Sequence, residues 1–389
     1  MTNERRRRSR PTEENDMRTV TTTVALGVTA VVALGLTGCG APPGVVGGAT
    51  GSALPVYEDF DAMDAGEREE ALVAAAEEEG EVTVYLRADD VFQELEDAFE
   101  AEYDVDVTIV NPGRVDVVRQ QVLEQAAAGR MEADLVEVFT SDLELVYGEQ
   151  GIAAPMPEFL AQASADPSLA TEFAVETVQY PWVPVWNTDL VTGDNVPTTW
   201  EDFLDPFWED RLVIASGTQD WYFGWFQILT EQEGMSTAEF AELFAGIAAN
   251  VSVVDSNNPA AAGVASGEYY ANPANALVSA QRIGEAAPIT WEPAFDKTVI
   301  TPAGIGLMAD APNPAAAMLF AQWYLEEGLE IVEKEQFVVT HPNETDLAGA
   351  ELYRADLSGI TSEEFQQWRT AYDALVKGGE DILPAYVQD

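Results

Sequence analysis

Strand and helix patterns alternate along the first part of the chain, and this alternation limits the fold more than any other feature. Glu81–Leu86, Val105–Val110 and Ala133–Phe139 have the apolar pattern of strands. Val91–Tyr103 and Asp116–Gly129, which lie between them, have the apolar spacing of helices. Consecutive strands joined by helices run parallel in one sheet, because each helix returns the chain to the end where the previous strand began. The sequence therefore predicts an α/β fold.

A second series of segments begins near Val183. Its predicted strands and helices are Trp200–Phe207, Arg211–Ala215, Asp220–Gln232, Thr237–Ala248, Val251–Val254, Pro259–Ser266, Asn275–Glu285, Pro302–Met308, Pro314–Glu327 and Glu363–Val376. Two α/β lobes fit a chain of 389 residues. Because open sheets of this type bind ligands at the carboxyl ends of their strands, two facing lobes would enclose a cleft.

Acidic residues greatly outnumber basic ones. Sixty-nine Asp and Glu against eighteen Lys and Arg give a formal net charge of −51. Such a charge repels phosphate backbones and anionic membrane surfaces, so we expect no nucleic-acid partner. Hydrophobic residues make up 47%, which excludes a disordered acidic chain. The composition is typical of a halophilic protein, in salt where the Debye length is about 3 Å or less; an acidic protein from ordinary medium is the alternative.

The N-terminal residues have the pattern of a targeting segment. A basic stretch precedes the apolar run Thr19–Leu36, and small residues then lead to Cys39, the chain's one cysteine. This pattern resembles the lipobox of secreted lipoproteins. We expect residues 1–39 to be a lipoprotein signal peptide, Cys39 to carry the lipid, and residues 40–60 to be a flexible tether. An uncleaved anchor helix is the alternative to the signal peptide. The export route, Sec or twin-arginine, and the true start, Met1 or Met17, are left open.

Several motifs of the body stand in an order found in one protein family. They are Glu81–Tyr85, Ala133–Asp134, Glu149–Ile152, Val185–Leu190, Pro197–Trp208, Gly263–Glu268 and Ala311–Ala317. In these motifs the chain resembles ABC-transporter solute-binding proteins of the iron(III)/thiamine/spermidine-type branch. The resemblance implies the type II periplasmic-binding-protein fold, with two Rossmann-like lobes around a central cleft. We expect residues 61–182 with 290–340 to form lobe 1, and residues 183–289 with 341–389 to form lobe 2.

The resemblance also implies a function. The chain is expected to be a monomeric receptor on the extracellular face of the cell membrane, attached only through its lipid. It would close on a small solute by hinge motion and deliver it to ABC permease and ATPase subunits. A sensing role is not distinguished from transport. We expect no cofactor and no enzymatic activity, because the one histidine, His341, is poorly placed for a Ser-His-acid site and a single histidine cannot form a paired-His metal site. A carboxylate-based extracellular glycoside hydrolase is a distant alternative.

The expected cleft residues follow predicted strands or begin predicted helices. They are Arg87, Asp89, Asn111, Arg114, Thr140, Ser141, Thr218, Asp220, Trp221, Tyr222, Asn257 and Asn258. The backbone N–H groups at the start of a helix suit an anion or a hydroxyl-rich ligand. Together with two arginines, they favour a small anionic or hydroxylated organic solute. Of the aromatic residues, we expect Trp221 to contact it.

A ferric-ion-binding protein with a non-standard site is the second interpretation. The positions of the family's ferric ligands fall on Asp89, Phe139, Leu277 and Val278. Three of these four side chains are unable to bind a metal, so we assign no metal site. The adjacent pair Tyr269 and Tyr270 is the remaining ferric candidate, and the one histidine, His341, lies beyond the second lobe's main series.

Overall fold

The computed structural model describes residues 49–86, 91–111, 115–293, 295–334, 338–339, 347 and 349–387. These residues belong to one compact unit. The strands are β1 (Glu81–Tyr85), β2 (Asp106–Val110), β3 (Leu135–Phe139), β4 (Val175–Asn187), β5 (Leu212–Ala215), β6 (Val251–Val254), β7 (Ala271–Ala276), β8 (Ile289–Thr290), β9 (Lys297–Leu307), β10 (Val338–Val339) and β11 (Glu351–Arg354). The α-helices are α1 (Leu54–Asp61), α2 (Ala65–Glu79), α3 (Phe92–Glu100), α4 (Val115–Ala127), α5 (Thr140–Asp142), α6 (Glu158–Ala163), α7 (Gln219–Phe226), α8 (Thr237–Ala248), α9 (Asn257–Ser266), α10 (Leu277–Gly284), α11 (Pro314–Trp323), α12 (Leu329–Glu333) and α13 (Ser362–Val376).

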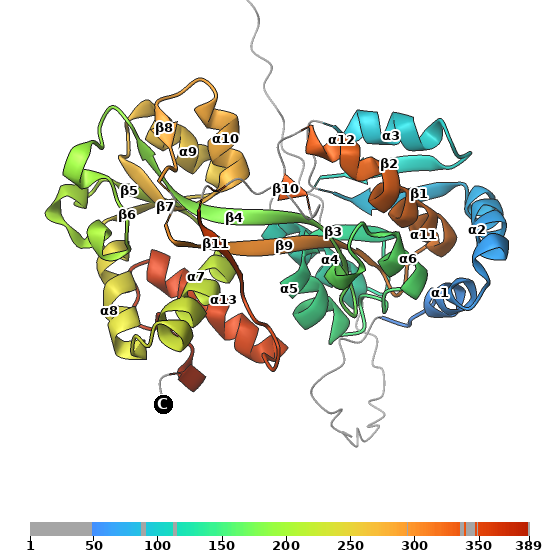
Figure 1. Ribbon diagram of the computed structural model, residues 1–389. Helices are drawn as coiled ribbons and strands as arrows, with labels where there is room; N and C mark the ends of the chain where they lie inside the picture. Colours follow the sequence, from blue (N-terminus) through green and yellow to red (C-terminus); the bar gives the residue numbers. More distant parts are fainter. Residues whose placement is uncertain are drawn as a thin grey trace, which may run out of the picture. The chain divides into compact units, whose positions relative to one another are not determined.

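The described strands form one mixed sheet in the order β2-β1-β3-β9-β4-β7-β5-β6 (Figure 1). β1 pairs in parallel with β2 and β3, and β5 pairs in parallel with β6 and β7. We call β1–β3 with their helices the first half, and β5–β7 with their helices the second half. The strands between them, β9 and β4, run antiparallel to each other and to β3 and β7 on either side, and β11 pairs in parallel with β9. The predicted α/β fold is confirmed, and the sheet as a whole is mixed rather than parallel.

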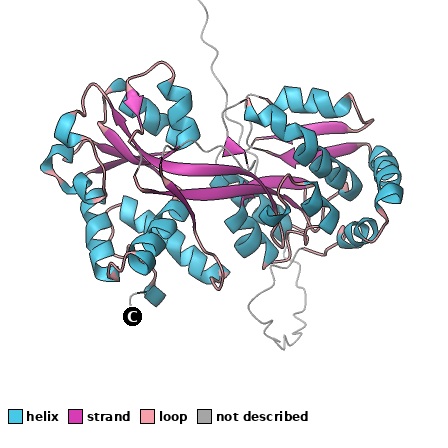
Figure 2. Cartoon of the chain, viewed as in Figure 1, coloured by secondary structure: helices cyan, strands magenta, loops and turns pink. Residues whose placement is uncertain are grey.

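The two long strands belong to both halves. β4 pairs with β9 over Val175–Pro181 and with β7 over Trp182–Trp186. β9 in turn pairs with β3 at one end and with β11 at the other. Figure 2 shows these two strands running between the helix-covered halves. The sequence did not reveal β4 as a strand because it contains two prolines, and Pro184 stands where the β4–β7 register shifts at a bulge.

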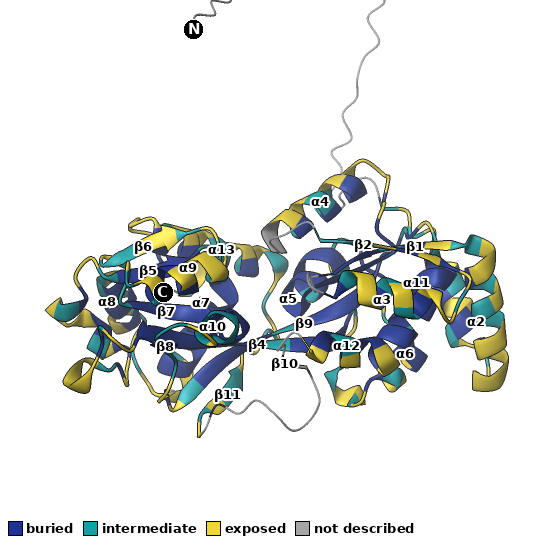
Figure 3. Cartoon of the chain, turned by 90° about the horizontal axis from the view of Figure 1, so that it is seen from above, coloured by how far each residue is buried: buried dark blue, intermediate teal, exposed yellow. Residues whose placement is uncertain are grey.

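Helices cover the sheet in both halves. In the first half α11 packs against α2 and β1, and in the second α9 and α10 pack together on β4 and β7. The helix α13 packs against α7 and α8 of the second half, and it also contacts the π-helical turn Leu143–Gly148 of the first. Figure 3 shows the central strands β4 and β9 largely buried and the outer faces of α2, α3 and α8 exposed. Three large side chains, Trp186, Trp208 and Trp368, are fully buried.

Most predicted elements form with small shifts of their ends. The helix Thr237–Ala248 and the strand Val251–Val254 have the predicted bounds. The prediction of one helix over Trp200–Phe207 was wrong, because the structure has two 3₁₀ turns, Glu201–Leu204 and Pro206–Trp208. Pro206 has no N–H to continue the first turn, and the carboxylate of the preceding residue, Asp205, accepts the N–H of Phe207 and starts the second.

The tether predicted for residues 40–60 ends earlier in the structure. Leu54–Asp61 forms α1, whose Tyr57 and Phe60 are buried in the core. The N–H of Ala53 donates to the carbonyl of Ala309 at 3.0 Å. The Gly- and Ala-rich composition misled the prediction, because two aromatic residues one helical turn apart suffice to attach this short helix.

Gly304 of β9 lies opposite Glu176 of β4. A Cβ atom at this position would stand 2.5 Å from the carbonyl oxygen of Val175 in β4. Gly304→Ala should therefore force the two strands apart and lower the free energy of unfolding by about 1–3 kcal/mol. Denaturant unfolding in molar salt measures this loss.

Gly66→Ala is the matched control. Gly66 lies in α2, and a Cβ atom there meets no other atom within 4 Å. The same substitution should leave stability unchanged or raise it by up to about 1 kcal/mol, since alanine favours the helix. Equal stability of the two variants would show that β4 and β9 yield at this contact.

Candidate functional site

A pocket of about 590 Å³ lies where residues of both halves meet, and we call it the cleft pocket. The first half contributes Phe139 at the end of β3, and β4 contributes Trp182. The second half contributes the loops after β5 and β6, and α13 contributes one wall. The lining residues are Arg119, Phe139, Trp182, Ser216, Gly217, Thr218, Gln219, Val253, Asp255, Ser256, Asn257, Gln366, Arg369, Thr370, Asp373, Val376 and Lys377.

Parallel pairing of β5 and β6 brings two loops to the same wall of this pocket. Both strands end there, and their loops lead into α7 and α9. Gly217 has a φ of 81°, a conformation that favours glycine, and so lets the chain turn sharply before α7. The hydroxyl of Thr218 donates a hydrogen bond to the hydroxyl of Tyr372, which in turn donates one to the carbonyl of Ala215. The loop after β5 is therefore fixed from behind by a tyrosine of α13.

A cluster of three charged side chains borders the cleft pocket. Asp142 at the end of α5 is fully buried. Its Oδ1 atom accepts from Nε of Arg119 in α4 at 2.8 Å and from the guanidinium of Arg369 in α13. Burial alone would raise the pKa of Asp142, but the two guanidiniums outweigh burial and hold it below its usual value. Asp142 is therefore an ionised carboxylate shared by two arginines.

A second buried carboxylate lies beside this cluster. Asp220 in the first turn of α7 accepts the hydroxyl of Ser141 at 2.8 Å and the side-chain amide of Gln219 at 2.9 Å. Burial raises the pKa of Asp220, and the charge of Asp142 raises it further. The Ser141–Asp220 bond joins α5 of the first half to α7 of the second.

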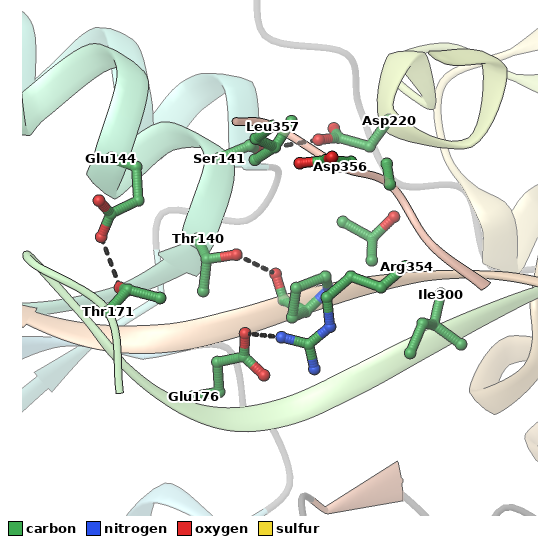
Figure 4. A pocket seen from close by; sticks show the side chains of 13 residues that line it. Thr140, Ser141, Glu144, Thr171, Glu176, Asp220, Ile300, Arg354, Asp356 and Leu357 are labelled. Atoms are coloured by element: carbon green, nitrogen blue, oxygen red, sulfur yellow. Dashed lines mark hydrogen bonds and ion pairs between the residues drawn. The ribbon is translucent and has the colours of Figure 1, made fainter. Parts of the chain in front are cut away.

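A second pocket of about 440 Å³ lies beside Ile300–Pro302 of β9, and we call it the β9 pocket (Figure 4). In Figure 4 Ser141 and Asp220 face each other on one side, and Arg354 reaches toward the buried Glu176, with which it forms an ion pair. The other polar groups are also engaged, since Glu144 accepts from Thr171 and from the Phe173 N–H. The remaining lining residues are Thr140, Asp356, Ala355 and Leu357.

The structure distributes the predicted site residues among several places. Thr218 and Asn257 line the cleft pocket, whereas Thr140, Ser141 and Asp220 line the β9 pocket. Asn111 is partly buried after β2, and Asn258 is exposed in α9; neither lines these two pockets. The predictions for Cys39, Arg87, Asp89 and Arg114, and the placement of His341, lie outside the described residues.

Trp221 and Tyr222 are core residues, contrary to the expectation that they face a solute. Trp221 is buried and packs its ring against Trp200 and Phe244, with centroids 5.4 Å and 5.8 Å apart. The hydroxyl of Tyr222 donates to the carbonyl of Ile382 at 2.8 Å. Their position at a loop-to-helix junction suggested exposure, but the first turn of α7 faces an aromatic core that the sequence does not display as a unit.

The tyrosine pair of the ferric interpretation has structural contacts. Tyr269 lies against Gly263 of α9, and Tyr270 packs on Phe207 under the guanidinium of Arg211. Both are partly buried and neither lines the cleft pocket or the β9 pocket. The described part of the chain also contains no group of three or more His, Cys, Asp or Glu residues placed to hold a metal ion.

Sequence reasoning missed the basic residues of the cleft pocket. Arg119, Arg369 and Lys377 line it, although the chain has only eighteen Lys and Arg. Arg119 lies inside α4 and the other two lie in or directly after α13, far from any strand end, so no local motif marks them. Their scarcity was the one available signal.

None of the helices that the structure describes is long and apolar enough to span a membrane.

Comparison with known proteins identifies related chains. The family model for bacterial extracellular solute-binding proteins matches residues 85–330. A comparison with curated protein sequences found no match.

Solved structures of similar fold include periplasmic and transporter proteins. The substrate-binding protein of an ABC transporter from Agrobacterium tumefaciens has a TM-score of 0.62 at 14% identity, covering 76% of this chain and 95% of that one. Iron-bound HitA from Pseudomonas aeruginosa has a TM-score of 0.59 at 16% identity, covering 75% and 99%. AfuA from Actinobacillus pleuropneumoniae, with fructose-6-phosphate bound, has a TM-score of 0.57 at 17% identity, covering 77% and 97%. At these identities the likeness shows the fold alone.

Asp220 makes a testable contribution to the pH dependence of stability. Its raised pKa means that the folded protein holds this proton more tightly than the unfolded chain does, so the associated stability is lost as pH rises through the folded pKa. Asparagine loses no proton. Asp220→Asn should therefore gain stability relative to the wild type as pH rises from about 4 to about 7, as measured by denaturant unfolding at several pH values.

Asp356→Asn is the control for this experiment. Asp356 lines the same β9 pocket, but hydrogen bonds from Ser358 lower its pKa. Its stabilising contribution is present at neutral pH and is lost on acidification, so this variant should lose relative stability as pH rises. The same trend in both variants would contradict the assignment of a raised pKa to Asp220.

Proposed function

The chain belongs to the family of bacterial extracellular solute-binding proteins, and from this premise we propose that it is a lipid-anchored receptor of an ABC importer. It captures a small solute between its two halves and delivers it to permease and ATPase subunits. It acts as a monomer and attaches to the extracellular face of the membrane through its lipid alone. Proteins of this family bind and transport solutes, so we assign no enzymatic role.

The observation that carries this proposal is the composition of the cleft pocket. Its walls come from both halves of the sheet, and Trp182 of β4, one of the two strands that connect the halves, forms part of it. A solute in this pocket would touch both halves at once. Closure by bending of the connecting strands then brings the walls together around the solute, as hinge motion does in binding proteins of this type.

The proposed solute is a small anionic or hydroxylated organic compound. Three basic residues line the pocket in a chain whose net charge is −51. The hydroxyl of Ser216, the amide of Asn257 and the rings of Phe139 and Trp182 add polar partners and flat apolar walls. HitA and AfuA share this fold with different bound species, iron and fructose-6-phosphate, so the fold by itself selects neither.

The lipid anchor and the halophilic character rest on the sequence. The apolar run and the small residues before Cys39 support attachment through a thioether-linked lipid. The excess of acidic residues supports a protein kept in solution by high salt. In the described part of the chain, Thr50 and Ser52 bind the carboxylate of Asp310, so the chain is fastened to the body soon after the proposed tether.

Solute capture should both stabilise the protein and close it. In molar salt, a solute at a hundredfold excess over its Kd should raise the free energy of unfolding by about 2.7 kcal/mol, because it binds only the folded state. The same solute should lower the radius of gyration in X-ray scattering. Thermal unfolding against sugars, organic acids, sugar phosphates, polyamines, thiamine and ferric citrate identifies the class.

Trp182→Ala serves as the site variant in this assay. It removes a flat wall of the cleft pocket and should lower the affinity for the solute about tenfold, a usual loss for an aromatic contact. A response to ferric citrate alone, abolished in Tyr269→Phe and Tyr270→Phe, would favour the ferric interpretation. If no solute either stabilises or closes the protein, the proposed receptor function is refuted.

The anchor is tested separately. Cys39→Ser removes the one thiol able to carry a lipid and should move the protein from the membrane fraction to the medium. Membrane fractionation and intact mass measure the change, and loss of the lipid's mass should accompany release. Persistence of the variant in the membrane fraction would instead support an uncleaved anchor helix.

A further inference from the structure

Two arginines on the wall of the cleft pocket share one carboxylate oxygen. Arg119 comes from α4, and Arg369 comes from α13, near the other end of the chain. Their side chains are only 15% and 10% exposed, and both bind the same atom, Oδ1 of Asp142. Both residues line the cleft pocket.

Most N–H groups of these two guanidiniums have no hydrogen-bond partner among the described residues. Each guanidinium presents several N–H donors in a planar fork and donates one hydrogen bond to Asp142. Nε of Arg369 is buried without a partner in the described part of the chain. Buried donors without acceptors cost free energy, and that cost is larger for charged groups.

The charges of the cluster do not balance. Asp142 stays ionised and neutralises one of the two guanidiniums. The raised pKa of the neighbouring Asp220 disfavours a second negative charge there. Two other carboxylates line the pocket, Asp255 and Asp373, and Asp373 is paired with Lys377 at 2.8 Å. The cluster of Arg119, Arg369 and Asp142 therefore carries one positive charge that Asp142 does not neutralise.

We propose that this wall is an oxyanion subsite, where a carboxylate or phosphoryl group of the solute binds against Arg119 and Arg369. This inference rests on the proposed function and narrows it to solutes with an ionised oxyanion. Asp142 is a positioning residue, because it holds both forks at the pocket wall without touching the solute. Ser216 and Asn257 face the polar remainder of the molecule, and Phe139 and Trp182 face its flat or apolar part.

The orientation of both guanidiniums by one carboxylate favours this ligand chemistry. Planar guanidinium forks match carboxylate and phosphoryl oxygens, and charge-assisted hydrogen bonds are the strong ones. A latch between α13 and the first half would need Arg369 and Asp142 alone. Arg119 lies on the same half as Asp142, so it adds positive charge to the pocket without adding a link between the halves.

The test compares matched solutes on the purified full-length protein. Glucose, gluconate and glucose 6-phosphate form one series, and glycerol, glycerate and glycerol 3-phosphate form a second. Calorimetry in molar salt gives Kd, and thermal unfolding and scattering report stabilisation and closure. We expect at least one oxyanion to bind about tenfold to hundredfold more tightly than the neutral compound of its series. Within that series, tighter binding of the carboxylate or of the phosphate identifies the group that the subsite prefers.

Substitutions assign this preference to the two arginines. Arg119→Gln leaves Asp142 paired with Arg369, so the fold should persist, and the oxyanion should bind about tenfold or more weakly. Arg369→Lys keeps the charge but removes the fork, and it should weaken binding less than Arg369→Gln. Arg130→Gln, at an exposed position that lines neither pocket, is the control for loss of one positive charge and should leave Kd unchanged.

The outcomes separate this inference from the proposed function. A neutral or cationic solute that closes the protein and binds Arg119→Gln as tightly as the wild type overturns the oxyanion subsite and leaves the receptor function standing. A larger panel in which nothing binds and nothing closes refutes both. If an oxyanion stabilises Arg119→Gln, Arg369→Gln and the control variant equally, it binds elsewhere. This result also overturns the subsite.

Discussion

The buried carboxylate of Asp142 joins three segments that are distant in the sequence. It lies at the end of α5, and it holds arginines from α4 and from the C-terminal helix α13. Removing one partner of a buried ion pair is strongly destabilising, because the other is left as an uncompensated buried charge. Asp142 thus fixes the wall of the cleft pocket and the position of α13 together. The packing of α13 on α7, the Tyr372–Thr218 bond and the loop before α7 all depend on where α13 lies.

The acidity of the chain gives this cluster its significance. A net charge of −51 favours solubility and disfavours anionic partners, yet two of the few basic side chains, Arg119 and Arg369, lie on the wall of a pocket. Burial reduces screening by salt, so a partly buried pair of guanidiniums keeps its effect at ionic strengths where surface charges are largely screened. An acidic exterior and a positively charged cluster on a pocket wall are therefore compatible in one molecule.

The sequence predicted what local patterns determine. Periodicity located β1, β2, β3 and the helices between them, as well as α8 and β6, because each buries an apolar face of regular spacing. Periodicity missed β4, because its two prolines are unusual inside a strand, and it could not give the order of the strands in the sheet. The site was predicted in part: Thr218 and Asn257 follow strands and line the cleft pocket, whereas Arg119 and Arg369 reach it from helix interiors through long-range packing. The misplacement of Trp221 has the same origin, since the aromatic core that buries it is assembled from four separate segments.

The described chain enters the body at the first half. Thr50 and Ser52 bind Asp310, and Ala53 binds the carbonyl of Ala309, directly after the end of β9 that pairs with β3. All these contacts are with the first half. Within the described residues, the chain therefore first meets the body at the first half. For the proposed receptor, a lipid-held tether would therefore hold the first half, and hinge closure would move the second half, with α13 and its arginine, toward it.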